Sequence, residues 1–306
     1  MTKRPDLIFI TGATGFLGSW IIARLVDRGI RVVATDVSDD HRRLALLKPE
    51  LPAGLVDFRI CDVTDAAALE ALIGETRPTG IIHLAALQIP QCREMPARAA
   101  AINIGGHINV FEAARKAGIE RIIYTSSIAA KPRGPENAPS NLYGVFKKTD
   151  EEIARIYWQD YRLPSLGLRP YVVYGVGRDD GETSAITRAI EAAALGRDYE
   201  IPFTTRSCFQ YAGDVADVFA KVVTASWSGA LLSDVTDTVH STDDVLAAIR
   251  AVVPGAEVSS ADQVRVSPRE GFDTTALRQV IGEIRELPLT EGIRETVSLY
   301  RQIAAR

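Results

Sequence analysis

Two side chains with complementary acid–base chemistry stand four positions apart in the segment Tyr143–Lys147. On a helix this spacing places the phenol and the ammonium on one face. A free tyrosine, with a pKa of about 10, is a poor base at neutral pH, but a neighbouring cation stabilises its phenolate. We therefore predict that Tyr143 transfers a proton with help from Lys147. Ser127, which follows an apolar strand-like run, is placed to hold the substrate oxygen.

A glycine-rich turn, Thr11–Gly18, lies between the first apolar run and the first helical segment. Glycine lets the backbone adopt positive φ and approach a ligand closely. The free N–H groups and the dipole of the following helix form a site suited to a pyrophosphate. This strand–turn–helix context favours dinucleotide binding over a simple turn. The contacts expected from this turn are Gly12, Gly15, Phe16, Leu17 and Gly18.

Acidic residues end the second and third predicted strands. Asp36 stands where a ribose-binding acid belongs in a dinucleotide fold, and its carboxylate would repel a 2′-phosphate. We therefore predict NAD as the cofactor, although Arg42 and Arg43 are close enough in sequence to leave NADP open. Asp62, followed by Val63, is placed either to bond the adenine amino group or to cap the next helix.

The elements that must position these residues alternate through the first half of the chain. Continuous apolar strands indicate a sheet covered on both faces, and their alternation with helices indicates a doubly wound parallel α/β fold. The predicted strands are Leu7–Thr11, Arg31–Thr35, Val56–Cys61, Gly80–Leu84, Arg121–Thr125 and Ser165–Pro170. The predicted helices between them are Trp20–Arg28, Ala66–Glu75, Ala97–Ala117 and Asn141–Tyr161.

Beyond this point the strict alternation is lost. Residues 1–174 are therefore predicted to form the NAD-binding Rossmann domain. Residues 175–306 are predicted to form mainly a smaller, discontinuous substrate lobe, with some segments returning to the first domain. Helices are expected in this half at Ser184–Leu195, Asp214–Ala225, Asp243–Val252 and Glu291–Ala304.

The composition excludes several classes of protein. The formal charge of −4 over 306 residues carries no basic excess of the kind that nucleic-acid binding needs. The apolar run near the N-terminus, Leu7–Ile10, is far too short for a signal peptide or a membrane span, so a cytoplasmic location is expected by default. The three widely spaced cysteines predict reduced thiols. We expect no metal, and we interpret His83 and His240 as structural.

These motifs, with several further segments, resemble the extended short-chain dehydrogenase/reductase family, in its NAD-dependent epimerase/dehydratase branch. The resemblance touches nearly the whole chain. The further matching segments include His83–Ala86, Asn103–Gly106, Thr125–Ser127, Leu168–Gly175, Gln210–Val215 and Pro288–Tyr300.

The resemblance implies a role for each matching residue. Tyr143 would be the acid/base, Lys147 would support its ionisation and hold the nicotinamide ribose, and Ser127 would orient the substrate. Asn103 would support the site from a neighbouring helix. The other cofactor contacts expected are Leu84, Ala85, Ala86, Pro170 and Val173.

Departures from the family pattern bear on the substrate. Dehydratases of this family carry Asp-Glu where Ile128-Ala129 stand here, and nucleotide-sugar epimerases have an Arg-Asp-Phe run where this chain has Ser207-Cys208-Phe209. We therefore expect a small-molecule substrate such as a free sugar, a sugar acid or a similar polyol. The candidate substrate contacts, besides Ser127, are Gln88, Arg178 and Arg206.

Three alternatives stay open. A nucleotide-sugar 4-epimerase would use the same residues, and the sequence does not separate net dehydrogenation from epimerisation. A non-catalytic NAD(P)-binding sensor or scaffold is a reading of another class, although the tyrosine and lysine are both present.

Because the helices at Ala97–Ala117 and Tyr143 have broad apolar faces, and the corresponding helices pair in relatives, a two-fold homodimer is expected.

Overall fold

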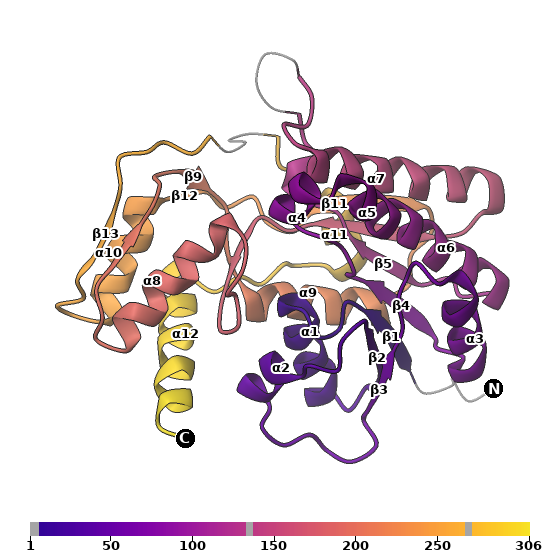
Figure 1. Cartoon of the computed structure of the whole chain (residues 1–306), viewed down its shortest axis with the longest axis horizontal. Helices are drawn as coiled ribbons and strands as arrows, with labels where there is room; N and C mark the ends of the chain where they lie inside the picture. Colours follow the sequence, from indigo (N-terminus) through magenta and orange to yellow (C-terminus); the bar gives the residue numbers. More distant parts are fainter. Residues whose placement is uncertain (1–5, 133–136, 267–270) are drawn as a thin grey trace.

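The computed structural model describes residues 6–132, 137–266 and 271–306. Its core is a parallel sheet of seven strands in the order β11-β6-β5-β4-β1-β2-β3 (Figure 1). This confirms the predicted doubly wound α/β fold. The strands are β1 (Leu7–Thr11), β2 (Arg31–Asp36), β3 (Val56–Ile60), β4 (Gly80–His83), β5 (Ile122–Thr125), β6 (Ser165–Arg169) and β11 (Ala230–Asp234).

Two layers of helices enclose the sheet. One face is covered by α3 (Ala66–Thr76), α6 (Gly106–Ala117) and α7 (Leu142–Tyr161), and the other by α1 (Phe16–Asp27) and α9 (Ala212–Thr224) (Figure 1).

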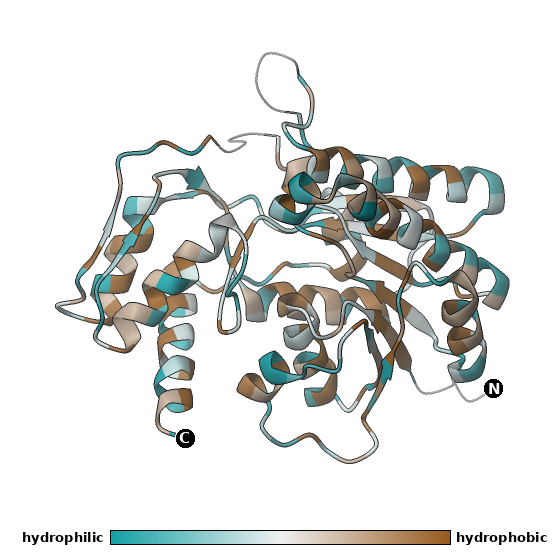
Figure 2. Ribbon diagram, in the orientation of Figure 1, coloured by the Kyte–Doolittle hydropathy of each residue, from teal (hydrophilic) through white to brown (hydrophobic). Residues whose placement is uncertain are grey.

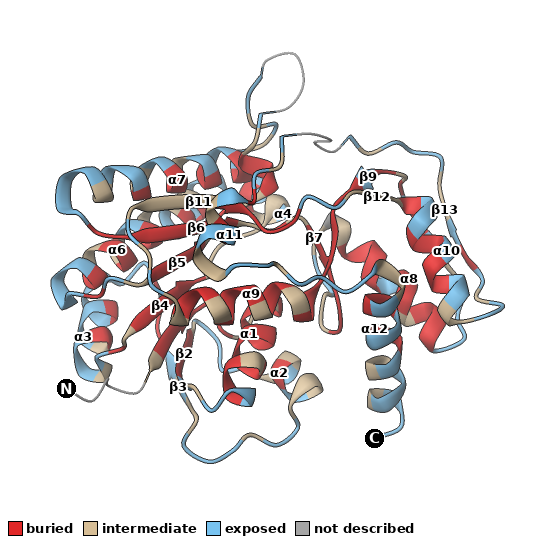
Figure 3. Cartoon of the chain, turned by 180° about the vertical axis from the view of Figure 1, so that it is seen from behind, coloured by how far each residue is buried: buried red, intermediate tan, exposed pale blue. Residues whose placement is uncertain are grey.

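Alternate residues of a strand point to opposite faces of the sheet, so a central strand contributes to both layers. In β1, Ile8 and Ile10 join the largest hydrophobic cluster, while Phe9 joins a second one on the other face. The continuous apolar run of this strand is explained by burial on both sides, which Figure 3 shows for the strands of the sheet.

A smaller lobe packs beside the sheet, at the left of Figure 1. Its helices are apolar toward the lobe interior and hydrophilic outside (Figure 2). It contains α8 (Ala185–Ala194), α10 (Thr242–Val252) and α12 (Leu289–Ala304), with β8 (Tyr199–Ile201), β9 (Arg206–Ser207), β12 (His240–Ser241) and β13 (Val258–Ser260). The remaining elements are α2 (Arg42–Leu47), α4 (Ile89–Glu94), α5 (Pro96–Ala100), β7 (Val172–Tyr174), β10 (Phe209–Tyr211) and α11 (Thr275–Ile281).

Two segments beyond residue 174 return to the first domain, since β11 pairs with β6 and α9 packs against β4 and β5. The helix expected at Ala97–Ala117 is interrupted: α5 passes into a π-helical turn, Ala101–Gly105, before α6 begins. Such turns often mark functional sites, and this one contains Asn103. No helix in the described ranges has the length and apolar character that crossing a membrane requires.

Candidate active site

A cavity of about 500 Å³ opens at the carboxyl ends of β1 and β4. The strand order reverses between these two strands, and doubly wound sheets bind their ligands at such a point. The cavity wall combines the loops after the first strands with residues of the smaller lobe. It therefore joins a predicted cofactor site to a predicted substrate site.

The glycine turn forms one wall of this cavity. Gly12 has φ of 69°, and a Cβ at this position would lie 2.7 Å from the backbone N of Ala85. A side chain is thus excluded where β1 and β4 come closest, which leaves a cradle of backbone groups for a pyrophosphate. The predicted cofactor residues that line the cavity here are Gly12, Gly15, Phe16, Leu17, Gly18, Asp36, Asp62, Val63, Leu84, Ala85 and Ala86.

The carboxylate of Asp36 is held at the end of β2 by local hydrogen bonds. Its Oδ2 accepts from the backbone N of Thr14 at 3.0 Å and from the Thr14 hydroxyl at 2.8 Å, and its Oδ1 accepts from the backbone N of Val37 at 2.8 Å. These contacts fix the acid at the cavity wall, in the position that a ribose diol requires. The Asp36 carboxylate and the backbone cradle of the glycine turn together fit the ribose and the pyrophosphate of NAD.

Of the two arginines that left NADP open in the sequence, Arg43 lines the cavity and Arg42 does not. Arg42 is exposed and pairs with Asp40, as a solvated basic run would. Arg43, one residue later on α2, lines the cavity and donates to the carbonyl of Gly177 at 3.1 Å and to Asp179 Oδ1 at 2.7 Å. The sequence did not reveal these partners of Arg43, because they lie more than 130 positions away along the chain.

Tyr143 and Ser127 reach the same cavity from two elements that pack unusually closely. Asn141 caps α7 by accepting from the backbone N of Gly144 at 2.9 Å. A Cβ at Gly144 would lie 2.2 Å from the carbonyl oxygen of Ala129, so the glycine is needed for this approach. Tyr143 is 8% exposed, and Ser127 Oγ accepts from the backbone N of Ala129 at 3.1 Å.

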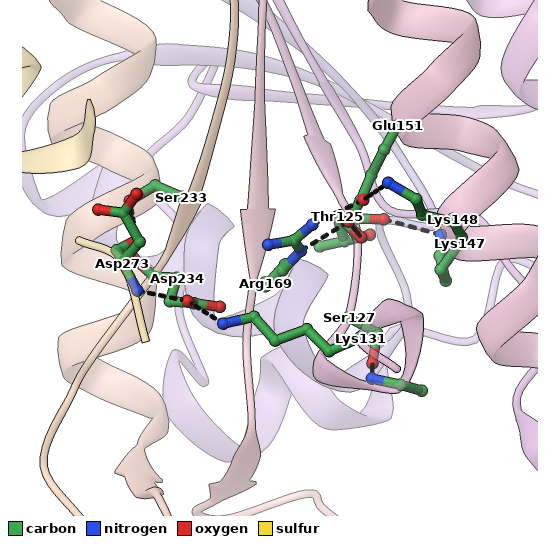
Figure 4. Close-up of polar contacts among 12 residues, drawn as sticks. Thr125, Ser127, Lys131, Lys147, Lys148, Glu151, Arg169, Ser233, Asp234 and Asp273 are labelled. Atoms are coloured by element: carbon green, nitrogen blue, oxygen red, sulfur yellow. Dashed lines mark hydrogen bonds and ion pairs between the residues drawn. The ribbon is translucent and has the colours of Figure 1, made fainter. Parts of the chain in front are cut away.

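Lys147 lies behind Tyr143 and is 2% exposed. Its Nζ donates to the carbonyl oxygen of Thr125 at 2.7 Å and lies 3.3 Å from Asp150 Oδ2 (Figure 4). The same atom is 6.0 Å from the centre of the Tyr143 ring. The ammonium therefore lies close to the Tyr143 ring without forming part of the cavity wall.

Asn103 also lies outside the cavity wall. Its side chain accepts from the backbone N of Leu87 at 2.8 Å and donates to the carbonyl of Leu87 at 3.0 Å. The π-helical turn thus fixes the loop that follows β4, and with it Gln88, which lines the cavity. Asn103 acts on this site through the backbone of a neighbouring segment.

His83 is buried at the end of β4, where its Nδ1 lies 2.7 Å from the hydroxyl of Thr11. Burial lowers the pKa of His83 to about 3, so the ring is neutral at physiological pH. This hydrogen bond joins β4 to β1 beneath the glycine turn. Within the described residues, no cluster of three or more His, Cys, Asp or Glu side chains is arranged to hold a metal ion.

The far end of the cavity is built from distant segments. Pro170, Val173 and Arg178 line it, whereas Arg206 is exposed on β9 and does not. Arg206 is therefore not placed to bind a ligand in this cavity, because the neighbouring Ser207 is the residue that faces it. The residues that sequence reasoning missed here are Tyr171, Asp179, Asp180, Ser207 and Arg265.

Arg178 is a partly buried cation at this end. Its guanidinium lies 5.6 Å from the centre of the Phe16 ring, and its Nη2 donates to the Thr183 hydroxyl at 3.4 Å. It forms no ion pair with an acidic side chain that the structure describes, and its Nε is buried without a hydrogen-bond partner there. Burial lowers the pKa of Arg178, and the nearby Tyr143 opposes this shift.

The comparisons with known proteins agree with this geometry. The model of the NAD dependent epimerase/dehydratase family matches residues 8–231. A UDP-glucose 4-epimerase of Mycolicibacterium smegmatis is 29% identical over 95% of this chain and 97% of its own. The crystal structure of a Thermus thermophilus UDP-glucose 4-epimerase in complex with NAD is 27% identical, with a TM-score of 0.76 over 96% of this chain and 99% of that one.

A structure of L-threonine dehydrogenase from Clostridium difficile shares the fold at 20% identity, with a TM-score of 0.83 over 98% of this chain and 99% of that one. The fold, the cavity and the family match define the class: an NAD-dependent enzyme with a Rossmann domain. The chain belongs to the NAD-dependent epimerase/dehydratase family, within the extended short-chain dehydrogenases/reductases. Its cofactor is NAD.

Proposed function

We propose that this enzyme transfers hydride between NAD and a carbinol carbon of a small sugar acid or hydroxy acid. The observation that carries the proposal is Arg178, a partly buried guanidinium whose Nε has no hydrogen-bond partner and which has no acidic partner among the described side chains, in the same cavity as Tyr143. A charged group in such a place is stabilised by an anionic ligand. A substrate carboxylate would supply that anion.

Tyr143 would remove the proton of the substrate hydroxyl, and bound NAD would accept the hydride. Ser127 would donate a hydrogen bond to the substrate oxygen from the neighbouring turn. Lys147 would stabilise the phenolate and bond the nicotinamide ribose. Lys147 Nζ lies 6.0 Å from the centre of the Tyr143 ring, and a nearby cation is what a tyrosine base generally requires.

The remaining cofactor contacts proposed are those of the cavity wall. The glycine turn would hold the pyrophosphate, Asp36 the adenine ribose, and Asp62 with Val63 the adenine. Leu84, Ala85 and Ala86 would pass beside the cofactor, and Pro170 and Val173 would pack near the nicotinamide. Asn103 would act through the backbone of Leu87.

A screen of NADH formation tests the substrate class. Its three arms are uronic, aldonic and simple hydroxy acids, the matching neutral sugars, and UDP-sugars. We expect saturable turnover with acids and little with the neutral sugars of the same stereochemistry. Turnover of a neutral sugar as efficient as that of its acid would contradict the assignment of Arg178.

A second candidate is a nucleotide-sugar 4-epimerase, favoured by the names of relatives that match nearly the whole chain. Against it stands Ser207, which faces the cavity where such epimerases carry an arginine. Epimerisation returns the hydride and releases no net NADH. Conversion of UDP-glucose to UDP-galactose without NADH formation, and without activity on free acids, would establish this alternative.

We also propose a two-fold homodimer formed by α6 and α7. These helices expose apolar side chains at Ile108, Leu142, Val145, Ile156 and Tyr161. Ile156→Asp should give a monomer by light scattering, because a buried charge opposes the contact. Ile60→Asp, on an exposed isoleucine of β3, is the matched control and should remain dimeric.

The domain boundary at 174/175 and a cytoplasmic location stay predictions.

A further inference from the structure

Two adjacent carboxylates of α7, Asp150 and Glu151, are both buried but have different partners. Glu151 accepts from Arg169 Nε at 2.6 Å and Nη2 at 2.7 Å, and from the Ser126 hydroxyl at 2.6 Å (Figure 4). Its charge is thus neutralised by a two-point ion pair. Glu151 fastens α7 to β6 and to the end of β5, which is a structural role.

Asp150 has no such set of partners. It is 0% exposed, and its one ion pair within the described ranges is with Lys147 Nζ, at 3.3 Å. Its other oxygen, Oδ1, has no hydrogen-bond partner in the described part of the chain. A buried carboxylate oxygen without a partner is unfavourable for folding. Packing alone does not explain the acid at this position, whereas its contact with Lys147 does.

The other titratable groups around Asp150 are neutral or already paired. His107 of α6 is fully buried, and burial lowers its pKa well below the usual range, as it does for His83 of β4 behind it. Tyr124 of β5 is buried, and its pKa is raised well above the usual value. Glu151, on the same helix, is neutralised by Arg169. The charge that faces Asp150 is therefore that of Lys147.

We propose that Asp150 is a positioning residue that anchors the ammonium of Lys147 against Thr125 and reduces the positive charge felt by the Tyr143 phenol. The inference rests on the proposed roles of Tyr143 and Lys147. Burial raises the pKa of Asp150 to about 6, and Lys147 opposes the shift. The acid is therefore mostly ionised at neutral pH, and the ion pair is present under working conditions.

Asp150→Asn tests this proposal, with Glu152→Gln as the matched control. Glu152 is on the same helix, but its side chain is 49% exposed and it pairs with Lys148 and Arg155. The ultraviolet absorbance of each protein is recorded against pH with NAD⁺ bound. The absorbance of the same protein carrying Tyr143→Phe is then subtracted, which leaves the titration of the Tyr143 phenol. Removing a nearby buried negative charge should move the midpoint down by about one pH unit, whereas the screened surface charge should move it by less than about 0.2.

An unchanged or higher midpoint in Asp150→Asn would overturn the proposal, as would an equal shift in Glu152→Gln. Should Asp150→Asn fail to fold, Asp150→Ser removes the same charge and is titrated in the same way. The titration needs no substrate, so it does not depend on the substrate screen. Loss of the proposed function would appear as turnover surviving Tyr143→Phe, which is a different measurement.

Thermal unfolding without cofactor gives a second readout. The pKa of Asp150 is raised on folding, so the folded protein binds this proton more tightly than the unfolded chain does. Stability from this group is therefore lost as the pH rises from about 4 through about 6. Between about pH 5 and pH 7.5, the midpoint temperature of unfolding of the wild type should fall relative to that of Asp150→Asn. His83 and His107 are common to both proteins, so their contributions cancel, and parallel curves would contradict the buried ionised pair.

Discussion

The two ends of the cavity are built in different ways. The cofactor end is made by short segments that directly follow β1 to β4. The substrate end draws side chains from the loop after β7, from β9 and from the segment after β13, up to Arg265. Local chain geometry thus fixes what binds at the first end, whereas at the second the identity of the ligand depends on side chains brought together from distant segments.

The largest effect is expected where the two ends meet, at Tyr143. Tyr143→Phe removes the oxygen that moves the proton but keeps the ring in its packed site. Turnover should fall by about 10²–10⁴-fold, the usual contribution of general acid–base catalysis. NADH binding, measured by fluorescence, should stay within about twofold, because the glycine turn is unchanged. Retention of more than about a tenth of the turnover would contradict the catalytic assignment and favour the scaffold alternative.

Lys147→Met should impair both ends at once. Turnover should fall by roughly 10²-fold, and NADH should bind more weakly, since one ammonium serves the phenol and the ribose. The variant should also be less stable by about 3 kcal/mol, because it leaves Asp150 buried without its partner. Chemical denaturation measures this loss.

The double variant Lys147→Met/Asp150→Asn separates the two consequences. It should recover most of the stability but none of the turnover. Recovery of turnover together with stability would show that Lys147 contributes only to folding.

The substrate end can be examined alone through its arginines. Arg178→Gln should raise KM for a carboxylate substrate by roughly 10–100-fold, the usual range for losing a charge-assisted hydrogen bond of about 1.5–3 kcal/mol. Arg206→Gln is the matched control and should change KM by less than about twofold, because Arg206 is exposed outside the cavity. Steady-state kinetics with one acid substrate compares the two. Equal effects would remove the distinction between these arginines.

The smallest effect is expected at the adenosine side of the cofactor end. NAD should bind at least about tenfold more tightly than NADP, a difference of roughly 1.4 kcal/mol. Asp36→Ala should narrow that gap, because it removes the repulsion of the 2′-phosphate and leaves Arg43 close by. Calorimetry gives both dissociation constants. Equal constants in the wild type would show that Asp36 does not select the cofactor.

Sequence reasoning was most successful where spacing along the chain dictates geometry. The six predicted strands appear within a residue or two, as do most of the helices. The helix at Ala97–Ala117 was wrong in detail, because the side chain of Asn103 bonds the backbone of Leu87 and the helix widens there into a π-helical turn. That bond joins segments whose contact no periodicity reveals.

The sequence by itself determined the doubly wound fold, the glycine cradle, and the phenol and ammonium on one helix face, because each depends on residues that are close along the chain. The tertiary structure decided which arginine faces the cavity. Arg178 and Arg206 look equivalent in the sequence, yet the first is partly buried against Phe16 in the cavity and the second is exposed on β9. It also buried Lys147 and Asp150, which are spaced i and i+3 on α7, in a dry interior. Burial and partner choice are set by packing between distant elements, and local patterns do not encode them.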